Sequence, residues 1–165
     1  MVDSRGTLAQ DARRGERLEL RVPTTATQLP AVRAMAADLA MRMDYDLDAV
    51  EDLRLAVDEA CATLTTVAAG DSPLTVVFET TRAGLHIEAW VPTADGVDVP
   101  RDGFGWAILA TLVDTVQARR ATQATVPGGN GTDSPVGVIA MDKYLPGQRP
   151  TGVGSGAGQN LSVAR

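Results

Sequence analysis

Glu59 and Thr63 are the two residues whose types and spacing most plainly allow chemistry. They are four positions apart within the segment from Asp52 to Leu64. On an α-helix this spacing makes them neighbours, one turn apart on the same surface. A carboxylate and a hydroxyl held together on a rigid helix can orient a water molecule, a metal ion or an incoming hydroxyl group. The alternative is that both side chains belong to an ordinary solvated helix face.

The helix that carries these two residues is predicted by apolar residues that recur three and four positions apart. The repeat consists of Val50, Leu53, Val57, Ala60, Leu64 and Val67. Glu59 and Thr63 lie beside this stripe, on a second row that also contains Leu55. Because an aspartate can cap the start of the helix and Gly70 can end it, we expect the helix from about residue 47 to residue 68.

The other expected elements follow from local patterns of apolar and polar residues. They are a strand over 18–22, a helix from 25 or 27 to 43, strands over 74–78 and 85–91, a helix over 106–114, and strands over 115–119 and 136–144. Helices therefore come in runs rather than alternating singly with strands. This order predicts an α+β fold, a two-layer sandwich whose mostly antiparallel sheet is covered on one face by helices. The other face would be open or used for assembly.

The length of 165 residues favours one domain with a core large enough to stand alone. We expect this domain over residues 17–145. A polar, charged tail over 1–16 would precede it, and a tail over 146–165 that is rich in Gly, Ser and Gln would follow it. Both tails have the composition of disordered segments.

The charge of the chain bears on the class of partner. There are 21 acidic and 15 basic residues, which gives a net charge of -6. This balance argues against a nucleic-acid partner, which would need a dense basic surface, but not against a partner that is itself basic. No apolar run approaches the length of a membrane span, and the first residues do not read as a secretory signal. We therefore expect a cytoplasmic protein that does not bind membranes.

Two residues of the strand expected over 85–91 are of interest for their surroundings. His86, the sole histidine, lies near Glu88 and is expected on the surface or at an interface. Trp90 shares the outward side of this strand with both. An exposed tryptophan there would indicate a protein interface, and packing in the core is the alternative.

With these elements in place, the chain resembles the GHKL ATPase superfamily. Within it, the chain is most similar to the anti-sigma-factor serine kinases of the RsbW and SpoIIAB type, in an actinobacterial variant. The segment Leu53–Cys61 resembles the family's helix with a Glu-x-x-x-Asn box, and Gly103–Val116 resembles its glycine box with the following helix. The pair Gly131-Thr132, followed by a strand that ends in Met141–Leu145, resembles a third family segment. The resemblance covers about residues 17–145 and implies the histidine-kinase-like ATPase (Bergerat) fold, with ATP and Mg²⁺ as cofactors.

The resemblance also implies a role for individual residues. Glu59 stands where the family has its general base, which draws the proton from a serine hydroxyl that attacks the γ-phosphate; such help is worth about 100- to 10,000-fold in rate. Gly103 and Gly105 would let backbone N–H groups approach phosphate oxygens, because no Cβ stands in the way. The start of the helix at Trp106 would add its dipole. Thr132 matches a threonine that lies near the nucleotide.

Two positions depart from the family pattern. Thr63 stands where the family has the asparagine that binds Mg²⁺, and a hydroxyl is a shorter ligand for a metal that tolerates little error in geometry. A helix hydroxyl bonded to its own backbone is the alternative reading of Thr63. Asp95-Gly96 stands a few residues beyond the place of the Asp-x-Gly-x-Gly box that reads adenine, and is otherwise a simple turn. Loss of such a buried partner costs about 1–3 kcal/mol. Both departures predict weak nucleotide binding and still weaker phosphoryl transfer.

The resemblance implies two functions that do not exclude each other. The first is an anti-sigma factor that sequesters an alternative, stress-response sigma factor and is countered by an anti-anti-sigma protein with a STAS domain. The second is an active serine/threonine protein kinase that phosphorylates this anti-anti-sigma protein. A third reading is a small ATP-binding module with a different client. Family members work as homodimers, and either the sheet edge or the helix from Thr27 to Met43 could supply the contact.

Overall fold

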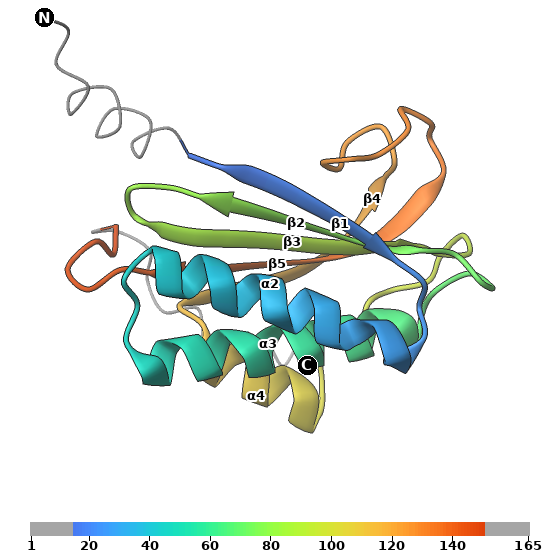
Figure 1. The fold of residues 1–165 in the computed structure, drawn as a ribbon. Coiled ribbons are helices and arrows are strands. Elements are labelled where there is room, and N and C mark those ends of the chain that lie inside the picture. Colours follow the sequence, from blue (N-terminus) through green and yellow to red (C-terminus); the bar gives the residue numbers. More distant parts are fainter. Residues whose placement is uncertain (1–14, 151–165) are drawn as a thin grey trace, which may run out of the picture.

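The computed structural model describes residues 15–150, which form five strands and three α-helices (Figure 1). In chain order the elements are β1 (Arg17–Val22), the 3-10 helix η1 (Ala26–Gln28), α2 (Leu29–Arg42), α3 (Leu47–Thr65), β2 (Leu74–Thr80), β3 (Gly84–Pro92), α4 (Phe104–Leu112), β4 (Thr115–Thr122) and β5 (Pro135–Tyr144). Most of the two expected tails, residues 1–14 and 151–165, lies outside the described residues.

The five strands form one sheet in the order β1-β2-β3-β5-β4, and every neighbouring pair is antiparallel. The strands expected over 74–78 and 85–91 form the hairpin of β2 and β3, which pairs Phe78 with Ile87 across the ladder. All three α-helices lie on one face of this sheet (Figure 1). The predicted α+β two-layer sandwich is therefore confirmed.

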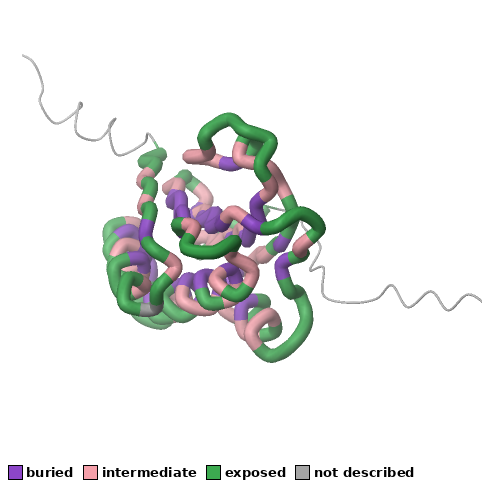
Figure 2. Tube along the Cα trace, turned by 90° about the vertical axis from the view of Figure 1, so that its right-hand side faces the viewer, coloured by how far each residue is buried: buried purple, intermediate pink, exposed green. Residues whose placement is uncertain are grey.

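The core lies between the sheet and the helices, where buried residues gather (Figure 2). The apolar stripe of α3 faces it: Val50, Leu53, Val57, Ala60 and Leu64 are all buried. Asp46 caps α3, since its Oδ1 accepts a hydrogen bond from Ala49 N at 2.8 Å. Cys61 belongs to this core, and burial, together with the nearby Asp58 carboxylate, raises the pKa of its thiol to about 12. Its thiol therefore stays protonated, as expected of a small core residue.

The outer face of the sheet is partly covered by the chain itself, through the loop between β4 and β5. The indole Nε1 of Trp90 donates to the carbonyl of Pro127 in this loop at 2.9 Å, and Trp90 is only 2% exposed. Val126, Val136 and Val138 complete a small apolar cluster there. Farther along, Arg21 Nη2 of β1 donates to the carbonyl of Gly128 at 2.9 Å. Trp90 therefore has the packing role, rather than that of an exposed interface residue.

Candidate functional site

Glu59 of α3 lies directly against the backbone of Gly105 of α4. A Cβ added to Gly105 would overlap Oε1 of Glu59 and would lie 2.9 Å from its Cδ. Only glycine allows α4 to approach the carboxylate so closely. Glu59 is half-buried in this position. The structure thus brings together the candidate general base and one of the two glycines that the sequence singles out.

The other glycine, Gly103, begins α4. It has φ 94° and ψ -176°, a conformation that favours glycine, and the space around its missing Cβ is open. Its carbonyl accepts the first hydrogen bond of the helix, from Ala107 N at 3.3 Å. No side chain caps the N-terminus of α4, so the N–H groups of its first turn have no capping oxygen within the described residues. Such a start of a helix, which lies beside open space, can receive an anionic oxygen.

The other end of α4 is held by Lys143 of β5. Its Nζ donates to the carbonyl of Leu112 at 2.7 Å and to Oδ2 of Asp52 in α3 at 3.0 Å. A cation at the C-terminus of a helix also interacts favourably with the helix dipole. Contacts at both ends, Glu59 with Gly105 and Asp52 with Leu112 through Lys143, show that α3 and α4 run in opposite directions.

Lys143 was not among the residues that the sequence singled out. The available signal was its position in the strand. Lys143 pairs with the buried Leu85, so both side chains lie on the side of the sheet that faces the helices. A lysine on the buried face of a strand needs a partner for its charge. That requirement could have directed attention to Asp52, one of the acids of the neighbouring helix.

Thr63 lies one turn after Glu59 and is half-buried. Its carbonyl, rather than its hydroxyl, is engaged, since it accepts a hydrogen bond from the Thr66 hydroxyl at 2.7 Å. Within residues 15–150 there is no group of three or more His, Cys, Asp or Glu side chains that could hold a metal. Glu59 and Thr63 thus offer one carboxylate and one hydroxyl. This set fits Mg²⁺ only if phosphate oxygens and water complete the octahedron, as is usual for nucleotide-bound Mg²⁺.

The remaining predicted site residues lie apart from this pair of helices. Asp95 and Gly96 are exposed in a turn that is closed by Val97 N donating to the carbonyl of Ala94 at 3.3 Å. Thr132 is exposed in the β4–β5 loop, where its hydroxyl donates to Oδ1 of Asn130 at 2.7 Å. No hydrogen bond, ion pair or close glycine contact of the described residues joins these three to Glu59 or to Gly105.

A different threonine lies where the chain leaves β3. Thr93 is buried, and its N–H donates to the carbonyl of Pro135 at 3.1 Å. A Cβ on Gly137 of β5 would lie 2.8 Å from Val99 Cγ2 and 3.2 Å from Thr93 Cγ2, so the loop after β3 folds closely onto the sheet. Sequence reasoning missed Gly137, although a glycine inside a strand often marks such a close approach. The buried polar group in this loop is therefore a hydroxyl rather than an aspartate.

The comparison with protein families bears on both helices of this site. The family model described as the histidine kinase-like ATPase domain matches residues 22–130, a range that includes all of α3 and α4. The chain belongs to the histidine kinase-like ATPase family. The sequence resemblance to this ATPase superfamily is thereby confirmed.

Within the histidine kinase-like ATPase family, the chain is similar to proteins named RsbW. It is 37% identical over 101 residues to the anti-sigma-F factor RsbW of Mycobacterium tuberculosis (strain CDC 1551 / Oshkosh), which covers 61% of this chain and 60% of that protein. It is 26% identical over 136 residues to the serine-protein kinase RsbW of Bacillus cereus (strain B4264), a match that covers 68% of this chain and 83% of that protein. It is 25% identical over 158 residues to the serine-protein kinase RsbW of Bacillus subtilis (strain 168), a match that covers 80% of this chain and 88% of that protein. The chain thus spans less than two thirds of the length of the mycobacterial relative, and the predicted likeness to the RsbW type is confirmed.

A further finding concerns membranes. None of the helices in residues 15–150 combines the length and the apolar character that crossing a bilayer requires.

Proposed function

We propose that this protein is an anti-sigma factor, which binds and sequesters an alternative, stress-response sigma factor. The observation that carries the proposal is the 37% identity to a relative named anti-sigma-F factor RsbW. The net charge of -6 supports it, because the DNA-facing regions of a sigma factor are basic and opposite charges speed association. In this proposal a STAS-domain anti-anti-sigma protein competes for the bound sigma factor, all in the cytoplasm.

A pull-down tests sequestration. The purified, immobilised protein is incubated with each purified alternative sigma factor of the source organism, one at a time. We expect one of them to be retained at micromolar concentration. If none is retained, the proposed function is wrong.

We also propose that the protein binds ATP with Mg²⁺ between α3 and the start of α4. The N–H groups at the uncapped start of α4 would receive phosphate oxygens, and Gly103 leaves the approach to them open. The Thr63 hydroxyl would contribute to the shell of Mg²⁺, which supplies positive charge to the phosphates when bound. Calorimetric titration with ATP and ADP, with and without Mg²⁺, measures whether and how tightly the nucleotide binds.

Phosphorylation of the anti-anti-sigma protein is the second candidate function. The observation in its favour is that the Glu59 carboxylate lies at the first turn of α4, beside Gly105. There it would accept the proton of a serine hydroxyl while the serine oxygen bonds to the γ-phosphorus and ADP leaves. Incubation of the partner with labelled ATP and Mg²⁺ tests this step. We expect label with the wild-type protein and at least about 100-fold less with Glu59→Gln; no label with either would leave only the binding role.

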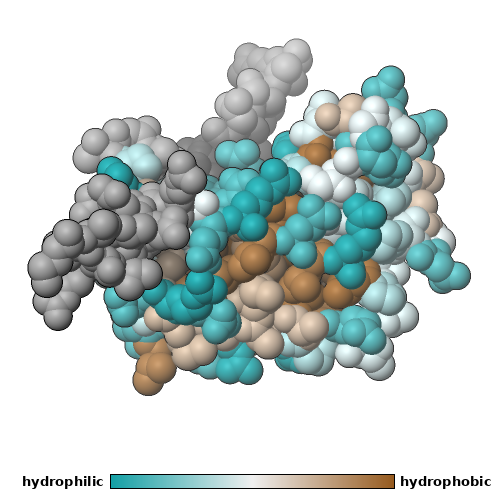
Figure 3. All heavy atoms as spheres, turned by 45° about the horizontal axis from the view of Figure 1, so that its top comes forward, coloured by the Kyte–Doolittle hydropathy of each residue, from teal (hydrophilic) through white to brown (hydrophobic). Residues whose placement is uncertain are grey.

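We further propose a homodimer that forms at the edge strand β1 and the adjoining α2. β1 is one of the two edge strands of the sheet, the other being β4, and its outer side pairs with no strand of the described residues. Leu18 and Leu20 of β1 are half-buried, as is Met35 of α2. Hydrophobic atoms gather on the face where β1 and α2 lie (Figure 3). Light scattering should give the mass of two chains for the wild type and one for Leu20→Lys; a dimer that persists in the variant would place the contact elsewhere.

A further inference from the structure

Helix α4 is composed almost entirely of apolar residues, although most of them are not buried. Its sequence, Phe-Gly-Trp-Ala-Ile-Leu-Ala-Thr-Leu, contains no charged residue, yet Leu109 is its only buried residue. Phe104 is 81% exposed and Ala107 is exposed as well. A helix on the surface of a globular protein normally turns a polar face to the solvent. α4 instead presents apolar side chains on its outward side.

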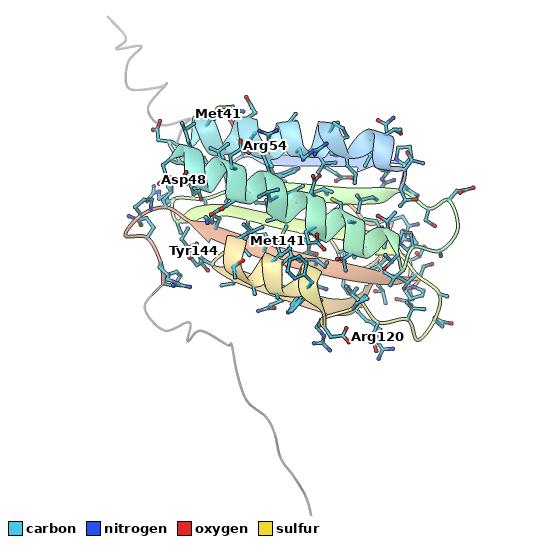
Figure 4. All side chains as sticks on the ribbon, turned by 90° about the horizontal axis from the view of Figure 1, so that it is seen from below. Met41, Asp48, Arg54, Arg120, Met141 and Tyr144 are labelled. Atoms are coloured by element: carbon cyan, nitrogen blue, oxygen red, sulfur yellow. The ribbon has the colours of Figure 1, made fainter. Side chains whose placement is uncertain are left out.

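A residue of α3 extends this apolar surface. Leu55 is 55% exposed and lies on α3 between Asp52 and Glu59, the two residues that reach the ends of α4. Residues three and four apart share a helix face, so Leu55 lies on the same face of α3 as Asp52 and Glu59, the face toward α4. Ile108 of α4 is half-buried. The two helices lie side by side in the view from below (Figure 4). We refer to Leu55, Phe104, Ala107 and Ile108 as the α4 patch.

The segments that border the α4 patch are acidic. α3 carries five acidic residues and one basic residue, and the loop 93–103 carries three acidic residues and one basic residue. Three bases from other elements pair with some of these acids: Arg33 with Asp58, Lys143 with Asp52 and Arg120 with Asp98. The border therefore keeps an excess of negative charge. Phe104, a large exposed aromatic side chain that directly follows the acidic loop, has the character of an interface anchor.

We propose, on the basis of the sigma-factor binding proposed above, that the α4 patch docks an amphipathic segment of the sigma factor, with an apolar face and basic flanks. The apolar face would cover Phe104 and Leu55, which removes exposed apolar surface from water. The basic flanks would meet the carboxylates of α3 and of the loop 93–103, which favours this partner and its orientation over acidic segments.

Calorimetry with matched variants tests the proposal. The sigma factor retained in the pull-down is titrated into the full-length wild type and into Phe104→Ser, Leu55→Ser and Leu47→Ser. Leu47 is the control, because it is 79% exposed and is the first residue of α3, outside the α4 patch. We expect Phe104→Ser and Leu55→Ser each to weaken binding at least about tenfold, and Leu47→Ser to change it less than about twofold. Circular dichroism confirms that each variant is folded.

The possible outcomes separate this proposal from the function on which it rests. If the wild type binds no sigma factor, both are wrong. If the wild type binds and Phe104→Ser binds as tightly as Leu47→Ser, sequestration stands and the α4 patch is not the docking surface. If Phe104→Ser instead converts a dimer into a monomer without changing sigma-factor affinity, the patch is a contact between copies of this chain, which also overturns the proposal.

Discussion

The carboxylate of Glu59 occupies the place that a side chain on Gly105 would need. An added Cβ would lie 2.9 Å from Glu59 Cδ and would overlap Oε1. The overlapping atoms belong to the end of the flexible Glu59 side chain, so an added methyl group would have to turn this carboxylate away from α4. Glu59 is half-buried, so its present position depends on Gly105 having no side chain. The geometry of the candidate ATP site and the packing of the two helices are thus the same contact.

Gly105→Ala is expected to destabilise the protein by at most about 1 kcal/mol, because the Glu59 carboxylate can turn away from the added methyl group and alanine is favoured over glycine in a helix. The cost should fall sharply in a Glu59→Ala background, because the overlapping carboxylate is then gone. Urea unfolding of the four proteins of this double-mutant cycle measures the coupling.

Gly103→Ala provides the control for this cycle. Its Cβ would meet nothing within 4 Å, but its φ of 94° is unfavourable for alanine. We expect a cost from backbone conformation alone, about 1 kcal/mol, with or without Glu59. Equal costs of Gly105→Ala in both backgrounds would show that the Glu59 carboxylate does not resist a methyl group at this position.

We expect Lys143 to contribute more to the stability of the fold than an exposed ion pair does. Lys143→Met removes the donor to the carbonyl of Leu112 and to Asp52, and the side chain is only 17% exposed. Loss of a hydrogen-bonded charge at such a site is expected to cost about 1–3 kcal/mol. Arg54→Met removes an exposed pair with Glu51 and should cost less than about 0.5 kcal/mol. Denaturant unfolding measures the loss of free energy of unfolding in each variant. Equal losses would mean that the contacts of Lys143 with α4 and Asp52 do not stabilise the fold.

Tyr45 joins the two central strands at one end of the sheet. Its hydroxyl accepts from Leu85 N at 3.0 Å and donates to the carbonyl of Lys143. Burial raises the pKa of Tyr45 to about 12, so the hydroxyl keeps the proton that it donates at neutral pH. Tyr45→Phe should cost about 1–3 kcal/mol, because Leu85 N is left buried without a partner. Tyr144→Phe is the control, since the Tyr144 hydroxyl makes no hydrogen bond within residues 15–150. Thermal unfolding measures the midpoint temperature of both variants, and an equal decrease in the two would contradict this role of Tyr45.

Local sequence patterns were sufficient to predict α3 and its buried face. The period of the apolar residues depends only on neighbours within a few turns, so Val57 and Leu64 could be assigned to the core from the sequence. The ends of helices were less well predicted. α3 ends at Thr65 rather than Ala68, and α4 begins at Phe104 rather than Trp106, because Gly103 already provides the start of the helix.

Contacts between distant segments could not be predicted from these patterns. Periodicity places Glu59 on a helix, but only the fold shows that Gly105 of another helix lies against it. The same holds for the loop between β4 and β5. Its return over the outer face, where Pro127 accepts from Trp90, depends on sheet order rather than on local composition. Asp95-Gly96 forms the turn that its composition favours, and its role in base recognition stays a prediction.

The pair of His86 and Asp142 makes stability depend on pH. These residues lie opposite each other on β3 and β5, with His86 Nδ1 2.7 Å from Asp142 Oδ1. The pKa of His86 is raised, chiefly by its hydrogen bond to Asp142 and also by the charges of Asp142, Glu88 and Glu79, against the effect of burial. Burial acts to raise the pKa of Asp142, but its hydrogen bonds with His86 and Thr115 outweigh this and the pKa is lowered.

The sign of the effect follows from these two shifts. A raised pKa means that the folded protein holds the His86 proton more tightly, so this stabilisation is complete below the ordinary histidine pKa of about 6.5 and is lost as pH rises through the raised value. The contribution of Asp142 is complete above its ordinary pKa of about 3.9 and is lost as pH falls through the lowered value. The pair should therefore stabilise the fold most between about pH 4 and pH 6.5.

His86→Gln should remove this dependence. We expect the difference in free energy of unfolding between wild type and His86→Gln to be largest near about pH 5.5 and smallest near about pH 8.5. Urea unfolding at intervals across this range measures it. Arg119→Gln is a suitable control, because it removes the 2.9 Å ion pair with Glu88 on the same face of the sheet and leaves the contact of His86 with Asp142 in place. If the difference in free energy of unfolding stays constant with pH, His86 carries no charge in the folded protein. Its contact with Asp142 is then an ordinary hydrogen bond between a neutral imidazole and a carboxylate.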